Sequence, residues 1–273
     1  MERDERERRF GFGENWSHFL SVIGEEQIRL AEASLRDMLR VESLAGKTFL
    51  DVGSGSGLFS LAARRLGAKV HSFDYDAQSV ACTAELKRRY YLDDSGWTVE
   101  HGSVLDVAYI ESLGHWDIVY SWGVLHHSGA MWCAFDNVAN LVAARGKLYI
   151  AIYNDQGWAS RVWLIIKQWY NRLPRKLRWL VLGPALLRLW GPTTVRDLVR
   201  GQPFETWRRY AEASTRGMSP WRDAVDWVGG LPFEVAKPEQ VFEFFQGRGF
   251  ILRRLKTCAG GHGCNEFVFD GAR

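Results

Sequence analysis

Apolar residues recur at helical spacing along HFLSVIGEEQIRLAEASLRDMLR, residues 18–40, which predicts a leading helical region. Gly46 ends this pattern, and from Lys47 onward short apolar runs typical of strands alternate with segments of helical periodicity. The strand-like runs are TFLDV, KVHSFDY, WTVEHGSV, WDIVYSW and KLYIAIY, and the main helical segments are GLFSLAARRLG, AQSVACTAELKRRYY and MWCAFDNVANLVAARG. This alternation predicts βαβ units and a parallel sheet.

The pattern is interrupted after Tyr153. Residues 154–236 do not continue the alternation, and they contain eight of the thirteen tryptophans. A helical segment, PEQVFEFFQGRG, and two strand-like runs, FILRRLKTC and NEFVFDG, then follow. We therefore predict four parts: an N-terminal helical region (1–46), a core (47–153), a Trp-rich, basic helical insertion (154–236), and a C-terminal helix and β-hairpin that complete the core (237–273).

The composition is that of an ordinary globular protein. Of its 273 residues 47% are hydrophobic, enough for a substantial core, and the net charge of +3 favours neither a nucleic-acid binder nor a broadly cationic membrane coat. The four cysteines are too few and too scattered for a disulfide framework, and no leading apolar segment has the pattern of a secretory signal. These features indicate a reducing cytoplasm.

A glycine-rich loop follows the first strand-like run, in the sequence FLDVGSGSG. Gly53, Gly55 and Gly57 lie between a strand and a helix, where missing side chains let a ligand approach the backbone beside a helix N-terminus. The spacing is G-x-G-x-G rather than the nicotinamide pattern G-x-G-x-x-G. Asp51 would disfavour a phosphate and favour an ammonium group, and Asp74, at the end of the next strand, can accept hydrogen bonds from two ribose hydroxyls.

Four motifs in this order resemble those of the class I S-adenosylmethionine-dependent methyltransferases: FLDVGSGSG, HSFDYD, GSVLD and WDIVYSWGVLHH. The resemblance covers residues 30–153 and resumes at 237–273. It implies an α/β fold with a doubly wound, mostly parallel seven-stranded sheet, Rossmann-like and closed by an antiparallel hairpin. It also implies S-adenosyl-L-methionine as the cofactor.

The resemblance further implies which residues hold the cofactor. Asp51 would lie near its amino group, the three glycines along its methionine part, and Asp74 at the ribose. The adenine side and the sulfonium side would be met by Asp106, Val107 and Ser121. Two alternatives stay open: Asp76 could bind the ribose rather than cap the following helix, and Asp106 could cap the segment VAYIESL.

The loop SWGVLHHS, after the fourth strand-like run, indicates the kind of acceptor. It lacks the Asn/Asp-Pro-Pro-aromatic motif that usually accompanies methylation of nucleic-acid amines, and Cys133 lies on a predicted amphipathic helix, where a structural cysteine is the commoner case. His126 and His127 could remove the proton of a hydroxyl or ammonium acceptor. A histidine at the place of His127 is common in the ubiquinone-biosynthesis O-methyltransferases, which this loop resembles, whereas those enzymes have Glu at the place of His126. Either histidine could instead fix the loop through hydrogen bonds.

Topology supplies further candidates, because parallel strands point their carboxyl ends toward the ligand. The loop CAGGHGCNE of the final hairpin overhangs the same edge, so His262 is a third catalytic candidate or simply part of a polar turn. With Cys258 and Cys264 it would make a poor metal site, since no fourth ligand is evident, and we predict no metal. Four residues at the strand ends are expected to contact the substrate: Trp122, Tyr153, Asn154 and Asp155.

The insertion has a strong amphipathic pattern at its start. On a helical wheel the apolar residues of RVWLIIKQWYNRL gather on one side, and Lys167 lies with other polar residues on the opposite side. Residues 156–196 contain eight basic residues and no acidic one. Three interpretations stay open: a lid that packs on the core, a lid that also meets a membrane surface through residues 158–190, and an RNA-binding surface.

The later part of the insertion, STRGMSPWRDAVDWVGGLPFEVAKPEQ, is expected to be mostly irregular. If this run returns to the site, it would offer further substrate contacts: Arg216, Asp223, Asp226 and Trp227.

Taken together, these patterns predict a methyltransferase that acts on a small or lipid-like acceptor, at a hydroxyl oxygen. Its place is the cytoplasm, with or without peripheral contact at the inner face of the membrane. The alternatives are an RNA methyltransferase, with nucleic acid the less favoured partner, and a non-catalytic subunit that binds the cofactor or a lipid.

Overall fold

The computed structural model describes Phe10, Leu20, residues 23–210 and residues 220–271. The chain divides into two compact units. We call Gly11–Gln156 with Phe233–Arg273 the sheet unit, and Met1–Phe10 with Gly157–Pro232 the helical unit.

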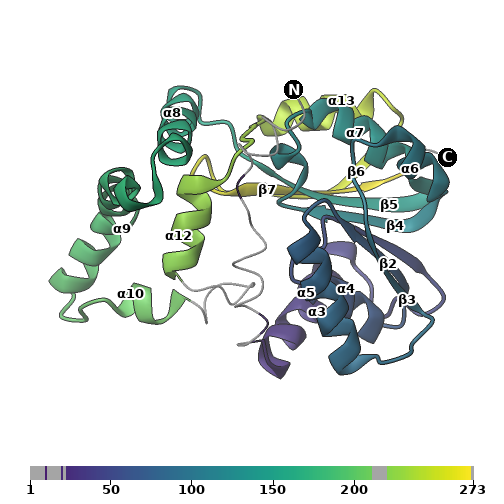
Figure 1. Cartoon of the computed structure of the whole chain (residues 1–273). Coiled ribbons are helices and arrows are strands. Elements are labelled where there is room, and N and C mark those ends of the chain that lie inside the picture. The colour runs from purple at the N-terminus through teal and green to yellow at the C-terminus, as the bar shows by residue number, and fades with distance from the viewer. Residues whose placement is uncertain (1–9, 11–19, 21–22, 211–219, 272–273) are drawn as a thin grey trace. The chain divides into compact units, whose positions relative to one another are not determined.

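The sheet unit is built on seven strands in the order β3-β2-β1-β4-β5-β7-β6 (Figure 1). Strands β1 to β5 pair in parallel, and β7 pairs antiparallel with both β5 and β6. The strand order reverses between β1 and β4, which is where doubly wound sheets bind their ligands. The predicted α/β fold is confirmed. The strands are β1 (Thr48–Val52), β2 (Lys69–Asp74), β3 (Trp97–His101), β4 (Trp116–Trp122), β5 (Val142–Tyr153), β6 (Ile251–Lys256) and β7 (Cys264–Asp270).

Helices cover both faces of this sheet, as Figure 1 shows. Successive strand residues point to opposite faces, so Phe49 belongs to one apolar cluster and Leu50 to the other. The first cluster includes the buried faces of α3 (Glu25–Leu39), α4 (Leu58–Arg65) and α5 (Ala77–Tyr90). The second includes those of α6 (Val107–Ser112), α7 (Met131–Asn140) and α13 (Pro238–Gln246).

The boundary between α7 and β5 differs from the prediction. The sequence pattern predicted a helix that continues to Gly146, but α7 ends at Asn140 and β5 begins at Val142. Val142 pairs with Trp116 of β4, and the register between these strands then shifts before Ile118. Strand pairing therefore overrides the helical pattern here.

The helical unit contains α8 (Trp158–Arg172), η2 (Arg175–Leu177), α9 (Trp179–Val199), α10 (Glu205–Arg208) and α12 (Pro220–Gly229). Tryptophan pairs join these helices: the rings of Trp163 and Trp227 lie 5.7 Å apart, and those of Trp190 and Trp207 lie 4.8 Å apart. The later insertion was expected to be mostly irregular; this prediction was wrong for residues 220–229, which form a helix, whereas residues 230–237 are irregular. Arg216 lies outside the described residues.

The amphipathic prediction for α8 was also wrong in one respect. Lys167 was placed on the polar side, but it is completely buried, and its Nζ donates to the carbonyl oxygen of Trp227. Ile165 and Trp169, placed on the apolar side, are more than half exposed, at 52% and 55%. The cause is the packing partner: α12 offers a backbone carbonyl and the Trp227 ring, which lies 4.8 Å from Nζ, to the side of α8 that carries Lys167.

Candidate active site

The glycine-rich loop lies at the carboxyl end of β1, where it packs closely against the SWGVL loop and α5. Gly53 and Gly57 have φ angles of 80° and 79°, a conformation that side chains disfavour. A Cβ at Gly53 would collide with the Val124 side chain, and one at Gly57 would lie 2.9 Å from the Cα of Thr83. The loop therefore needs glycine both for its conformation and for its close contact with the SWGVL loop and with α5.

Asp74 closes one side of this loop. Its carboxylate accepts hydrogen bonds from the backbone N–H of Gly55 and of Asp76, each at 2.9 Å. Burial raises the pKa of Asp74 to about 6, and the two backbone donors oppose that rise. The carboxylate is thus held at the end of β2, beside the glycine loop, where the predicted ribose contact requires it.

Asp51 belongs to a buried hydrogen-bond chain. It accepts from Ser60 Oγ at 2.5 Å, Ser60 Oγ and Ser72 Oγ lie 2.7 Å apart, and Trp97 Nε1 donates to Ser72. Burial raises the pKa of Asp51 to about 7, and the charge of Asp74 contributes to the rise. One buried and one half-buried carboxyl group beside one loop favour a ligand that carries positive charge, so the residues present fit a sulfonium and an ammonium group.

Two of the remaining predicted cofactor residues, Asp106 and Ser121, make hydrogen bonds within the fold, as does the alternative ribose partner Asp76. Asp76 caps α5 by accepting from Gln78 N at 3.2 Å, and Asp106 caps α6 by accepting from Tyr109 N at 3.1 Å. For Asp106 this is the alternative that the sequence left open. Asp106 and Val107 are exposed, whereas Ser121 is buried and donates its hydroxyl to the Val52 carbonyl, which ties β4 to β1.

The two histidines that follow β4 have different environments. His126 is completely buried, and its Nδ1 accepts from the backbone N–H of Tyr153 at 3.3 Å. Its ring lies against that of Tyr153, with centroids 3.8 Å apart. His127 is only half-buried and meets the Tyr153 ring edge-on at 5.3 Å. The ring of His126 is thus engaged with the end of β5, whereas the ring of His127 is partly accessible.

A short segment, residues 233–236, holds the histidine loop in place, and no sequence pattern predicted this contact. Glu234 N donates to the His126 carbonyl at 3.0 Å, and both Glu234 carboxylate oxygens accept from Met131 N, at 3.2 and 3.0 Å. The N-cap residue of α7, Ala130, makes no side-chain hydrogen bond, so Glu234 supplies the cap from a distant part of the chain. We call residues 233–236 the strap.

The strap also pairs with the end of β5. Ala236 N donates to the Tyr153 carbonyl and Asp155 N donates to the Ala236 carbonyl, each at 3.1 Å. The strap therefore joins two of the predicted substrate-contact positions to the histidine loop.

The final hairpin also contacts the end of β5. Asn154 N donates to the Gly263 carbonyl at 3.0 Å, and Asn154 Oδ1 accepts from Asn265 Nδ2 at 3.0 Å. These bonds engage Asn154 in holding the hairpin loop, whereas His262 in that loop is exposed. Trp122 at the end of β4 is half-buried, as is Tyr153. Among the described residues, no group of His, Cys, Asp and Glu could hold a metal ion.

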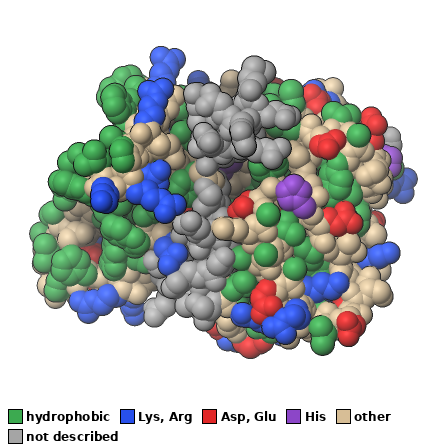
Figure 2. All heavy atoms as spheres, viewed as in Figure 1, with side chains coloured by type: hydrophobic (Ala, Val, Ile, Leu, Met, Phe, Trp, Pro, Cys, Tyr) green, Lys and Arg blue, Asp and Glu red, His purple; other side chains and the backbone are tan. Residues whose placement is uncertain are grey.

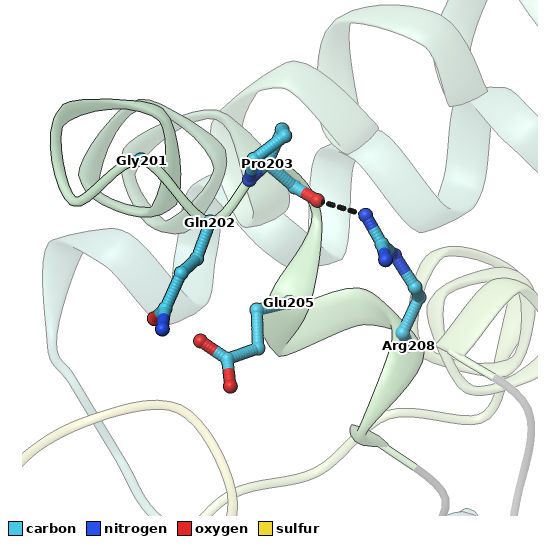
Figure 3. Close-up of a pocket in the computed structure, with 5 residues that line it drawn as sticks. All are labelled: Gly201, Gln202, Pro203, Glu205 and Arg208. Atoms are coloured by element: carbon cyan, nitrogen blue, oxygen red, sulfur yellow. Dashed lines mark hydrogen bonds between the residues drawn. The ribbon is translucent and has the colours of Figure 1, made fainter.

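The helical unit has a recess of its own, with a volume of about 320 Å³ (Figure 3). It lies where α9 ends and α10 begins, and the Arg208 guanidinium beside it donates to the Pro203 carbonyl. Glu205, on its rim, is paired with Arg209 at 3.0 Å. None of the predicted site residues lines this recess, whose lining is Gly201, Gln202, Pro203, Glu205 and Arg208.

Residues 24–207 match the family model described as a methyltransferase domain, and this match covers more than half of the chain. The chain belongs to the methyltransferase domain family. Its relatives include a ubiquinone biosynthesis O-methyltransferase of Xanthomonas euvesicatoria pv. vesicatoria (strain 85-10). That protein is 31% identical over 180 residues, which are 63% of this chain and 73% of the relative.

Solved structures share the fold of this methyltransferase. A magnesium protoporphyrin IX methyltransferase from Synechocystis PCC 6803 with bound SAH has a TM-score of 0.53 at 13% identity, covering 90% of this chain and 83% of that one. A SAM-dependent methyltransferase from Aquifex aeolicus has a TM-score of 0.50 at 12% identity, covering 93% and 97%. With the family match and the relative named above, the protein is a class I S-adenosylmethionine-dependent methyltransferase.

Proposed function

We propose that this methyltransferase methylates a hydroxyl oxygen of a small or lipid-like acceptor. The observation that supports this proposal is the position of His127, half-buried beside the Tyr153 ring and next to the loop that packs on Gly53. A hydroxyl must lose its proton to attack a methyl group, and a histidine can accept that proton near neutral pH. The O-methyltransferases among the relatives support oxygen as the acceptor atom.

S-adenosylmethionine, when bound, supplies a methyl group on a positively charged sulfur. We assign the ribose to Asp74, the methionine part to the glycine loop with Asp51 nearby, and the adenine and sulfonium sides to Asp106, Val107 and Ser121. His127 would take the acceptor proton, and His126 would hold the loop through its bond to Tyr153. Trp122 and Tyr153 would give the acceptor an apolar wall, and Asn154, Asp155 and His262 would add polar contacts.

A lipid-like acceptor would also influence where the enzyme works. We propose a cytoplasmic enzyme whose insertion, through residues 158–190, makes peripheral contact with the membrane into which such an acceptor partitions. Within the described part of the chain, no helix has both the length and the apolar content to cross a bilayer.

The experiment follows radiolabelled methyl from S-adenosylmethionine into a host extract split into RNA, protein, water-soluble and organic-soluble fractions. We expect label in the organic fraction, in a product whose methyl group mass spectrometry places on oxygen. His127→Ala should lower kcat by about 100-fold or more while the cofactor Kd stays nearly unchanged. Label in RNA would contradict the proposed acceptor, and a His127→Ala enzyme with normal kcat would leave that histidine only a structural role.

A further inference from the structure

The outer face of α9 carries an unusual pattern. Leu187 is 74% exposed and Val195 is 60% exposed, although the helix lies in a folded unit. These residues fall on a single stripe at intervals of three and four residues, so they share one side of the helix. The stripe, which we call the α9 face, consists of Leu180, Pro184, Leu187, Gly191, Val195 and Leu198. From first to last residue it extends about 27 Å.

The opposite side of α9 shows that this exposure is specific to one face. Leu182, Ala185 and Asp197 are the buried residues of the helix. The Asp197 carboxylate accepts from Thr206 N and Thr206 Oγ1, both at 2.8 Å, so the side chain is engaged inside the unit. The helix is thus packed on one side and presents a continuous apolar stripe on the other.

Charge around the α9 face has one sign. Exposed basic residues lie on α9, on the turn before it and directly after its last residue: Arg175, Lys176, Arg188 and Arg200. Arg196 is also exposed, but it turns to the packed side, where it donates to Thr206 Oγ1 and pairs with Asp197. Asp197 is the sole acidic residue between positions 157 and 204, and it is buried. Figure 2 shows hydrophobic side chains interspersed with Lys and Arg over this unit. An apolar face bordered by cations complements a surface that is anionic outside and apolar beneath.

Exposed tryptophans continue the pattern on neighbouring segments. Trp169 on α8 is 55% exposed and Trp179 at the start of α9 is 65% exposed. Indole rings favour the boundary between headgroups and acyl chains because they combine a large apolar surface with one N–H donor. An acidic protein partner would satisfy the charges but would not require so long an apolar stripe.

We propose that the α9 face is a docking surface for an anionic lipid bilayer, with the helix lying in the interface and its apolar stripe directed into the acyl region. This surface belongs to the helical unit and is separate from the cofactor site of the sheet unit. It also refines the broader prediction for residues 158–190, because it extends to Leu198 and assigns the contact to one side of one helix.

The test is vesicle sedimentation with the full chain, without cofactor or acceptor. Vesicles of phosphatidylcholine with about 30% phosphatidylglycerol should bind the protein about tenfold more tightly than vesicles of phosphatidylcholine alone. The double variant Leu187→Glu/Val195→Glu should reduce binding to the anionic vesicles about tenfold or more. As a matched control, Leu92→Glu/Ile251→Glu replaces two apolar residues of the sheet unit that are 68% and 47% exposed, and it should bind like wild type.

Unchanged binding by the α9 variant, or no binding by wild type, would overturn the proposal. So would sedimentation velocity that shows a dimer dissociated by Leu187→Glu/Val195→Glu, because the face would then meet a second copy of the chain. Cofactor affinity, measured on each variant by calorimetry, shows that the sheet unit is folded. This inference rests on the membrane contact proposed above for residues 158–190, so failure here would overturn that contact. Because no methyl acceptor is present, it would leave the proposed methyl transfer to a hydroxyl untouched.

Discussion

Asp74 is the residue on which the cofactor assignment can be tested most directly. We expect Asp74→Asn to weaken S-adenosylmethionine binding about 10- to 100-fold, because one charged acceptor is lost from a half-buried site. Isothermal titration calorimetry measures this change. Asp76→Asn is the control, since Asp76 was the alternative ribose partner and caps α5 through Gln78 N. If Asp76→Asn weakened binding and Asp74→Asn did not, the two assignments would have to be exchanged.

The burial of Lys167 should make the stability of the folded protein depend on pH. Burial lowers its pKa from 10.5 to about 7, so between these values the unfolded chain binds more protons than the folded one. Stability should therefore rise as pH increases from 7 toward 10. Lys167→Met lacks this titration and nearly preserves side-chain volume.

Thermal melts of both proteins at pH 7 and pH 10 measure the effect. The Tm of wild type relative to Lys167→Met should rise by roughly 5 °C or more between these values. Lys69→Met, at an exposed position, is the control and should show no such relative change. If the Tm of wild type rose as much relative to Lys69→Met as relative to Lys167→Met, the Lys167 ammonium would not be desolvated.

At the scale of elements, we expect the strap to affect catalysis by the histidine loop, although Glu234 is far from the histidines in the sequence. Glu234→Ala removes the cap of α7 and should cost about 1 kcal/mol of stability. Because the His127 loop leads directly into α7, we expect kcat to fall about tenfold while the cofactor Kd changes less than about threefold. Glu234→Gln keeps one acceptor oxygen and should restore much of kcat. Steady-state kinetics measure kcat of these variants. If Glu234→Ala had the kcat of wild type, the strap would not position the histidine loop.

The elements themselves were predictable to different degrees, for physical reasons. The strand runs and the glycine loop follow from local patterns, as do the caps at Asp76 and Asp106. The burial of Lys167 does not, because it depends on a carbonyl of α12, which lies 60 residues away. Glu234 was missed for the same reason: its partner, Met131 N, lies 103 residues away, and no local pattern links the two.

At the scale of the whole molecule, the sequence predicted the class of protein better than the details of its site. The G-x-G-x-G loop is a short local motif, so the sequence alone identifies it. The structure adds the reason for its glycines, because a Cβ at Gly53 or Gly57 would collide with neighbouring segments. His126 and His127 looked equivalent until folding buried one against Tyr153 and left the other half-exposed. Contacts between residues that are far apart in the sequence cause this difference in burial, and no local sequence pattern predicts it.

The sheet unit should fold and bind the cofactor without the helical unit. Within the described part of the chain, both of its apolar clusters are made of its own residues. The two connections that flank Gly157–Pro232 are paired with each other through Asn154 and Ala236, so removing residues 158–231 brings together ends that already lie side by side.

We therefore expect a chain with residues 158–231 replaced by a short Gly-Ser linker to melt cooperatively. It should bind S-adenosylmethionine within about threefold of the full chain by calorimetry. Asp74→Asn in the shortened chain should weaken that binding as it does in the full one, which shows that the same site is used. Vesicle binding should disappear, since the α9 face is gone. A shortened chain that stayed unfolded would mean that the helical unit supplies part of the stability of the sheet unit, and the two units would then have to be treated as one folding domain.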